Sequence, residues 1–340
     1  HRVDRRQRQM CIRDSTNNRS WVNNFGERGN LRAQSIQDSA TLNAWGQLDV
    51  GLGSQVRLIA GTQFAAARRE VTALLNTVSG RASYRQFSPR LGLLYTPAET
   101  VQLFANVSRS FEPPSMADLT AGGISPFAPL EAQRAWTGEV GARGQLGIVA
   151  FDVAAYSSFV RDEFIDQLSA NGRTSFTVNA DRTRRQGIEA GVDLFLLEPT
   201  GPAGVGLVWR QVWTFSDFKF DDDARYGNNR LAGVPRHLLA SELRLDGRAG
   251  WYLGANLRWV PEGPWVDYAN TTQAPGYDLW GLTAGWQISD ALRLFGSVEN
   301  LFDTRHIANV ATVSNQSRER ANAFTPGQGR AVFVGATARF

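Results

Sequence analysis

Long stretches of this chain alternate apolar and polar residues with a period of two. The clearest is 251–259, WYLGANLRW, whose odd-numbered positions hold Trp, Leu, Ala, Leu and Trp and whose even-numbered positions include Asn256 and Arg258. Side chains of a β-strand point alternately to its two sides, so this pattern indicates a strand with one apolar and one wet face. Because the pattern recurs through most of the chain, we predict an all-β fold.

We predict thirteen strands, separated by connectors that are alternately short and long. The strands lie near 37–50, 54–68, 83–96, 100–110, 133–144, 148–161, 183–197, 204–217, 235–246, 250–262, 276–289, 291–303 and 328–340. Short connectors such as GLGS at 51–54 contrast with long ones such as 69–82, 162–182 and 304–327. Short turns at one rim and long loops at the other are typical of a transmembrane antiparallel β-barrel.

Strand length and tryptophan placement also favour a membrane barrel over a soluble sheet. The alternating runs reach ten residues or more, whereas strands of soluble proteins average about five or six. Trp251 and Trp259 end an apolar face about 26 Å long, which in a tilted strand is close to the apolar band of a membrane barrel. We expect Trp251, Trp259, Trp280 and Trp286 to lie in the aromatic girdles at the lipid interfaces.

The charges are balanced and lie mainly on the polar faces of the predicted strands. The chain has 36 basic and 32 acidic residues without a basic block, so nucleic acid is not an expected partner. Every basic residue except Lys219 is an arginine, either because of coding bias or because guanidinium groups suit carboxylate and catecholate ligands. We expect acidic residues of the polar faces to pair with arginines such as Arg143, Arg244 and Arg258.

Residues 1–15, HRVDRRQRQMCIRDS, show no alternation and no helix cap. We interpret them as a non-native leader and treat 16–340 as the C-terminal part of a barrel. Bacterial single-chain barrels have an even number of strands, so an odd count suggests a truncated chain. Cys11 is the only cysteine, so an internal disulfide is excluded.

Several segments resemble TonB-dependent outer-membrane receptors of the siderophore-receptor type. These segments are SRSFEPPSMADL (108–119), LEAQRAWTGEVGARGQL (130–146), RRQGIEAGVDLFL (184–196) and VENLFDTRHI (298–307). His306 stands near a position where the family commonly has an aromatic residue. The chain ends AVFVGATARF, in which Val334, Ala338 and Phe340 resemble the C-terminal signal by which such barrels are recognised for assembly.

The resemblance implies a 22-stranded barrel with a plugged lumen. This chain would supply the last thirteen strands, and the plug domain would be absent from it. The implied function is uptake of a ferric siderophore or a similar scarce ligand across the outer membrane of a Gram-negative bacterium, energised through TonB by way of the plug. The implied partners are outer-membrane lipid, the barrel-assembly machinery, TonB and the small ligand.

Arginines and aromatic residues of the predicted extracellular loops are the candidate ligand contacts. They are Arg173, Arg182, Arg184, Arg185, Tyr226, Arg230, Trp265 and Tyr268. We expect no catalytic residue, cofactor or metal site, because no nucleophile elbow or phosphate loop occurs and the histidines lack metal-ligand spacing. Two alternative functions stay open: a passive porin-like channel and a soluble β-rich binding module.

Overall fold

Fourteen strands form one antiparallel sheet in chain order, from β1 to β13 followed by β16, in the computed structural model of the chain. The structure describes residues 3–76, 78–120, 127–168, 175–198, 204–319 and 322–339. The strands are β1 (Val3–Asn24), β2 (Glu27–Gly51), β3 (Val56–Leu75), β4 (Gly80–Ala98), β5 (Val101–Glu112), β6 (Gln133–Leu146), β7 (Val149–Leu168), β8 (Ser175–Leu197), β9 (Val205–Phe220), β10 (His237–Gly247), β11 (Trp251–Val260), β12 (Tyr277–Ser289), β13 (Leu292–Glu299) and β16 (Ala331–Ala338). Two helices, α1 (Met116–Thr120) and α2 (Gln316–Glu319), and a small hairpin of β14 (Ile307–Val310) and β15 (Phe324–Pro326) lie in the connections.

All thirteen predicted strands are present, and β1 is an additional one. β1 pairs with β2 residue by residue, from Val3 opposite Val50 to Asn24 opposite Glu27. Residues 1–15 lack alternation, yet an antiparallel ladder bonds through the backbone and forms without it. Among the described residues the main sheet therefore has fourteen strands rather than the thirteen predicted, and β14 and β15 form a separate hairpin. The non-native origin of 1–15 stays a prediction.

Two predicted loops are largely strand. β3 continues to Leu75 and β4 starts at Gly80, so most of 69–82 belongs to a hairpin. Likewise, β7 and β8 extend into the predicted loop 162–182. Alternation of apolar and polar residues is imposed where one face meets an apolar phase and the other meets water, and it fades in these extensions, where loops cover one face and bury Val71, Ile165 and Ala180. The hydrogen-bonded ladder continues beyond that point.

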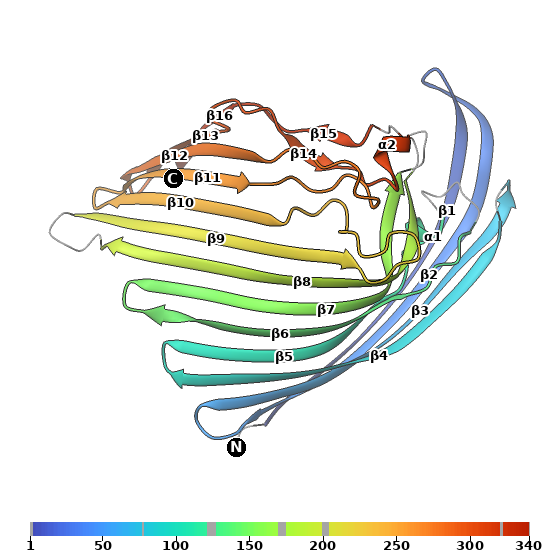
Figure 1. Ribbon diagram of the computed structural model, residues 1–340, viewed down its shortest axis with the longest axis horizontal. Coiled ribbons are helices and arrows are strands. Elements are labelled where there is room, and N and C mark those ends of the chain that lie inside the picture. The colour runs from blue at the N-terminus through green and yellow to red at the C-terminus, as the bar shows by residue number, and fades with distance from the viewer. Residues whose placement is uncertain are drawn as a thin grey trace.

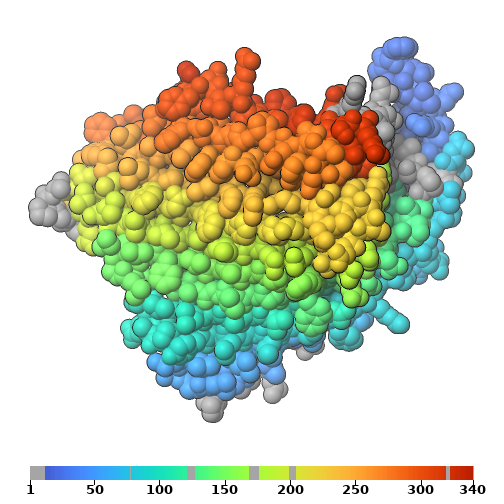
Figure 2. Space-filling view, in the orientation of Figure 1, coloured from blue at the N-terminus to red at the C-terminus, as the bar shows by residue number. Residues whose placement is uncertain are grey.

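The sheet is curved. In Figure 1 the short turns that follow β2, β4, β6, β10 and β12 lie at the left, the helices and the β14–β15 hairpin lie at the right, and β1–β4 run obliquely to β8–β13. The two-residue turn between β1 and β2 lies at the right, at the same end as the long connections. Figure 2 shows neighbouring strands following one another in chain order, from blue to red, as one continuous surface. Within the described residues, no ladder joins β1 to β16, so the sheet has two free edges.

The two faces of the sheet differ in chemistry, as the alternation predicts. One face, which we name the outer face, exposes large apolar side chains such as Leu253, Leu282 and Val334. The other, the inner face, carries ion pairs: Arg210 on β9 lies 3.5 Å from Asp193 on β8 and 3.2 Å from Glu242 on β10. The predicted pairing of inner acids thus occurs, but through Arg210.

Of the arginines named for this role, only Arg244 forms an ion pair among the described residues, with the inner-face acid Asp246. Arg143 donates to Gln102 at 2.9 Å, and Arg244 donates to Asp246 at 2.8 Å. No ion pair involving Arg258 occurs among the residues that the structure describes. Cross-strand register decides these partners, because it brings Arg210 directly opposite both Asp193 and Glu242.

Buried apolar clusters occur at the loop end rather than within the sheet. One contains Phe220, Tyr226 and Tyr268, and the other contains Val266 and Val310. A single sheet has no second layer to bury side chains against, so a packed interior forms only where loops fold over one another. No helix among the described residues is long and apolar enough to cross a membrane.

Candidate functional site

The segment that links β5 to β6 folds over the inner face at the loop end. Arg69 on β3 is buried beneath it and donates from Nε to the carbonyl of Pro114 at 3.1 Å. Tyr84 on β4 donates its hydroxyl to the carbonyl of Leu130 at 2.9 Å. Both residues bond to backbone carbonyls, so the path of the segment is fixed without dependence on its own side chains.

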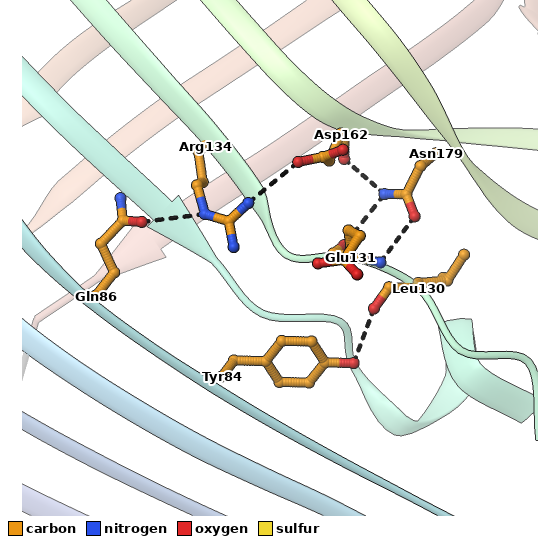
Figure 3. A network of polar contacts seen from close by, with 7 residues as sticks. All are labelled: Tyr84, Gln86, Leu130, Glu131, Arg134, Asp162 and Asn179. Atoms are coloured by element: carbon orange, nitrogen blue, oxygen red, sulfur yellow. Dashed lines mark hydrogen bonds and ion pairs between the residues drawn. The ribbon is translucent and has the colours of Figure 1, made fainter.

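Asn179 on β8 holds the other side of the same segment (Figure 3). Its amide accepts from the Glu131 N–H at 2.9 Å and donates to the Glu131 carbonyl at 3.1 Å. Arg134 on β6 donates to Gln86 on β4 and to Asp162 on β7, each at 3.1 Å. The segment is therefore bonded to β3, β4 and β8, and it covers part of the inner face at the loop end of the sheet.

The short helix α1 completes this inward fold. Ser115 and Asp118 cap it reciprocally, because the Ser115 N–H donates to the Asp118 carboxylate at 2.7 Å and the Asp118 N–H donates to the Ser115 hydroxyl at 3.3 Å. Leu119 is fully buried. Thr177 on β8 also donates to Asp118, so the helix is tied to the β7–β8 hairpin.

A second feature of the loop end is a buried hydrophobic cluster, which we name the loop hub. It is formed by Ile165, Ala180, Phe220, Tyr226, Leu231, Ala232 and Tyr268. The Phe220 and Tyr226 rings stack with centroids 4.9 Å apart. Tyr268 donates its hydroxyl to the Asp166 carbonyl at 3.0 Å. Burial raises the pKa of Tyr268 to about 12 and also raises the pKa of Tyr226.

Asp267 locks the loops that surround the hub. It is fully buried, and its carboxylate accepts the N–H groups of Thr271 at 2.8 Å, Thr272 at 3.2 Å and Gln316 at 2.9 Å, together with the Thr271 hydroxyl. Asn270 and Arg230 exchange two further bonds, at 2.8 and 3.0 Å. The connections after β9, β11 and β13 are thereby interlocked.

Asp267 is not among the residues predicted from the sequence. A signal was present in the segment DYANTT, because an Asp followed by Asn and Thr is typical of a turn that the carboxylate closes on its own backbone. The bond to Gln316, 49 residues away, has no local signal.

The structure brings four of the predicted ligand residues together in or against the loop hub. Tyr226 and Tyr268 are buried, and Trp265 packs against them half-buried. Arg230 donates to the Ser216 carbonyl at 2.8 Å and lies 3.5 Å from Asp217. Burial lowers the pKa of Arg230. Contact of these residues with a ligand stays a prediction, and Tyr226 and Tyr268 are placed as packing residues.

The other predicted contacts lie elsewhere. Arg182, Arg184 and Arg185 belong to β8 rather than to a loop, because the β7–β8 hairpin continues past the end of the alternation. Arg185 faces inward, where it pairs with the buried Glu163 and lies over the Phe218 ring. Arg182 and Arg184 alternate with it and therefore lie on the outer face. Arg173 lies outside the described residues.

No metal centre is formed by the residues that the structure describes, since no group of three or more His, Cys, Asp or Glu side chains is placed to hold an ion. The acidic tip at Asp221–Asp223 instead folds on itself. Asp223 accepts the N–H groups of Arg225 and Tyr226 at 2.8 and 2.9 Å. These bonds shape a turn of the loop.

Comparison with known proteins places this architecture in a family. The model of the family described as "TonB dependent receptor-like, beta-barrel" matches residues 5–301, which is most of the chain. The chain belongs to this family. A curated relative of this TonB-dependent receptor chain is the metal-pseudopaline receptor CntO of Pseudomonas aeruginosa, 25% identical over 281 residues that cover 79% of the chain and 37% of the relative.

Solved structures share the fold of this TonB-dependent receptor chain. The ferric yersiniabactin uptake receptor FyuA from Yersinia pestis superposes with a TM-score of 0.74 at 18% identity, over 99% of this chain and 51% of that one. The copper transporter OprC gives a TM-score of 0.81 at 15% identity, over 99% and 55%. The ferric citrate transporter FecA gives 0.79 at 17% identity, over 98% and 51%. The chain thus spans about half the length of these structures.

The predicted girdle tryptophans of the TonB-dependent receptor barrel lie exposed on the outer face. Trp251 is directly opposite Trp286 near the short-turn rim, and Trp259 and Trp280 lie nearer the loop rim. The side-chain positions fit two girdles, and their contact with lipid stays a prediction. In the predicted assembly signal, Val334 and Ala338 lie in β16, and Phe340 lies outside the described residues.

Proposed function

We propose that this chain forms the wall and part of the extracellular mouth of an outer-membrane receptor that takes up a chelated metal ion, energised through TonB. The observation that carries the proposal is the family match over residues 5–301. The relative named above is a metal-pseudopaline receptor, and the solved structures include receptors for ferric yersiniabactin and ferric citrate. A ferric siderophore or a similar metal complex is the substrate class that these relatives share.

The mouth offers a rigid surface for such a ligand. The β5–β6 segment is bonded to β3, β4 and β8, and the loop hub interlocks the later loops. A preordered surface binds with less loss of conformational entropy than a mobile loop. We propose that Trp265 and Arg230, which keep part of their side chains exposed at the hub, contact the ligand, whereas Tyr226 and Tyr268 support them.

Uptake by cells tests the function. Bacteria that lack their own ferric receptors would express the gene that encodes this chain, and uptake of radioactive iron would be measured from ferric citrate, a ferric catecholate and ferric yersiniabactin, with pseudopaline complexes as a further arm. We expect uptake of at least one complex, and we expect deletion of TonB to abolish it. Uptake that persists without TonB and extends to small sugars would instead show a passive channel.

Substitution of the hub residues tests the proposed contacts. Trp265→Ala should weaken binding of the transported complex by roughly tenfold, because aromatic anchors carry a large share of binding energy. Phe324→Ala, which removes an exposed aromatic side chain on β15, is the matched control and should bind as the parent does. Equal affinity of the two variants would remove Trp265 from the site.

Neither alternative from the sequence gains support. The family consists of receptors for transport, which fits the expectation that the chain is not an enzyme. No relative or solved structure named above is a passive porin or a soluble module.

A further inference from the structure

Four arginines and two aromatic side chains form a patch on the outer face near the loop rim. We name Arg109, Arg161, Arg182, Arg184, Trp136 and Phe159 the outer basic patch. Trp136 and Phe159 lie directly opposite each other and are 47% and 56% exposed. Arg109 is opposite Trp136, and Arg184 is opposite Phe159. Directly paired residues point to the same side of a sheet, so all four share the outer face.

Two arginines of the patch lie directly opposite each other. Arg161 on β7 is the cross-strand partner of Arg182 on β8. Each is two residues nearer the loop end than Phe159 or Arg184, which is about 7 Å along a strand. Like charges in this position repel each other. Neither Arg161 nor Arg182 forms an ion pair with a carboxylate of the described residues, and both are exposed.

The arrangement has the chemistry of a membrane interface. The aromatic pair continues the apolar outer face, and the arginines begin where that face ends. Arg109 lies 5.9 Å from the centre of the Trp136 ring, so a cation and an aromatic ring are held together at this boundary. Arginine presents a planar fork of donors that matches phosphate oxygens. The exposed aromatic rings, with the guanidinium groups beside them towards the loop end, fit a single molecule that has acyl chains and a phosphorylated head group.

We propose that the outer basic patch binds the phosphate groups of a phosphorylated lipid in the leaflet on the loop side, with Trp136 and Phe159 against its acyl chains. Phosphate oxygens between Arg161 and Arg182 add counter-charge on the outer face, because the neighbouring carboxylate of Asp162 forms its ion pair with Arg134. The inference rests on the proposed placement of the barrel in an outer membrane. Arg182 and Arg184, which the sequence predicts as ligand contacts, would then bind lipid on the outer face.

A free phosphate ion is the competing source of the same chemistry. A phosphate ion would bind to the arginines, but contact with the exposed rings of Trp136 and Phe159 would not strengthen its binding. The lipid is favoured because Trp136 and Phe159 adjoin the arginines in one register row. Competition by inorganic phosphate separates the two sources.

Native mass spectrometry of the purified full chain in detergent tests the proposal. The probes are diphosphorylated lipid A, the same lipid without its phosphates, and inorganic phosphate. The variant Arg161→Gln/Arg182→Gln/Arg184→Gln removes three charges from the patch. The matched control Arg143→Gln/Arg258→Gln/Arg293→Gln removes three from the inner face. Heat-modifiability on a gel confirms that each variant is folded.

We expect the patch variant to bind diphosphorylated lipid A about a hundredfold more weakly, since each arginine near an anionic lipid contributes roughly fivefold. The control should bind as the parent does, and millimolar inorganic phosphate should not displace the lipid. Parental affinity in the patch variant, or full displacement by inorganic phosphate, would overturn the proposal.

Comparison of the two lipids on the unmodified chain decides the matter even if the patch variant does not fold. Preference for the phosphorylated lipid supports the patch, and equal binding of both lipids overturns it. A chain that is not a membrane barrel would bind neither lipid, which would count against the proposed function as well. Failure of metal uptake alone would leave the lipid result unchanged.

Discussion

At the scale of single residues, the loop hub depends on side chains that combine a buried ring or carboxylate with well-placed partners. Tyr268 packs its ring against Phe220 and Tyr226 and uses its hydroxyl to bond to the Asp166 carbonyl, 102 residues away. Asp267, the preceding residue, satisfies three backbone N–H groups. Through these bonds, Asp267 and Tyr268 connect the segment between β11 and β12 to β7 and to the segment between β13 and β16.

The raised pKa of Tyr268 predicts a loss of hub stability in alkaline solution. The folded pKa is about 12, above the value of about 10 for an exposed tyrosine. The stabilisation is complete below about pH 10 and is lost as the pH rises towards 12, because the unfolded loop releases the proton first. Hydrogen exchange of residues 261–276 should accelerate over this interval.

The matched variant for this prediction is Tyr268→Phe. The Asp166 carbonyl keeps the Thr312 hydroxyl as a donor in this variant. The variant retains the ring but has no hydroxyl to donate or to deprotonate, so it should be less stable at neutral pH by about 1 kcal/mol for the lost hydrogen bond. Its alkaline loss should be smaller than that of the parent. An identical alkaline profile in both proteins would show that Tyr268 is not the responsible group.

At the scale of the elements, aromatic rings on the inner face pack directly against glycines of the neighbouring strand. The Phe104 ring on β5 covers Gly141 on β6, where a Cβ atom would lie 2.3 Å from it. The Tyr252 ring on β11 covers Gly285 on β12 in the same way. A ring lying flat on the backbone fixes the register of two strands, because a shift by one residue would replace the glycine with a side chain.

Two glycines of β6 allow a direct test of this packing. Gly141→Ala should destabilise the barrel by about 1–3 kcal/mol, as overpacking commonly does. Gly138→Ala is the control on the same strand, because a Cβ atom at Gly138 would have no neighbour within 4 Å. The midpoint of thermal unfolding, followed by heat-modifiability, measures both. Equal midpoints would argue that Phe104 moves aside at no cost.

At the scale of the whole molecule, the sheet separates an apolar surface from a charged one. Ion pairs such as Arg210 with Asp193 and Glu242 lie on one side, and exposed side chains such as Leu253 and Val334 lie on the other. A charge on a lipid-facing position costs roughly 2–4 kcal/mol near the midplane. The segregation is therefore what a membrane barrel requires.

Spin labels measure which side meets hydrocarbon. Labels at Leu253, Leu257, Val334 and Ala336 in lipid vesicles should be accessible to oxygen and protected from a water-soluble nickel chelate. Labels at Asn256 and Thr283, on the inner face, should show the reverse. Access of the chelate to the outer positions would contradict the placement in a membrane.

The fold class, thirteen of the strands and the side of the sheet on which most residues lie can be predicted from the residues alone. These properties are local, since the two-residue period of a strand appears directly in the order of the residues. The strand β1 has no such signal because backbone pairing needs no alternation, and the hairpin ends lose it because loops cover one of their faces.

The roles of the loop residues depend on contacts that form only in the folded protein. Tyr226 and Tyr268 had the chemistry of ligand contacts but became the interior of the loop hub, and Arg184 was separated from Arg185 by the two faces of one strand. The physical reason is distance along the chain. Contacts such as Tyr268 with Asp166 join residues that share no local period, so they arise only when the sheet brings the loops together.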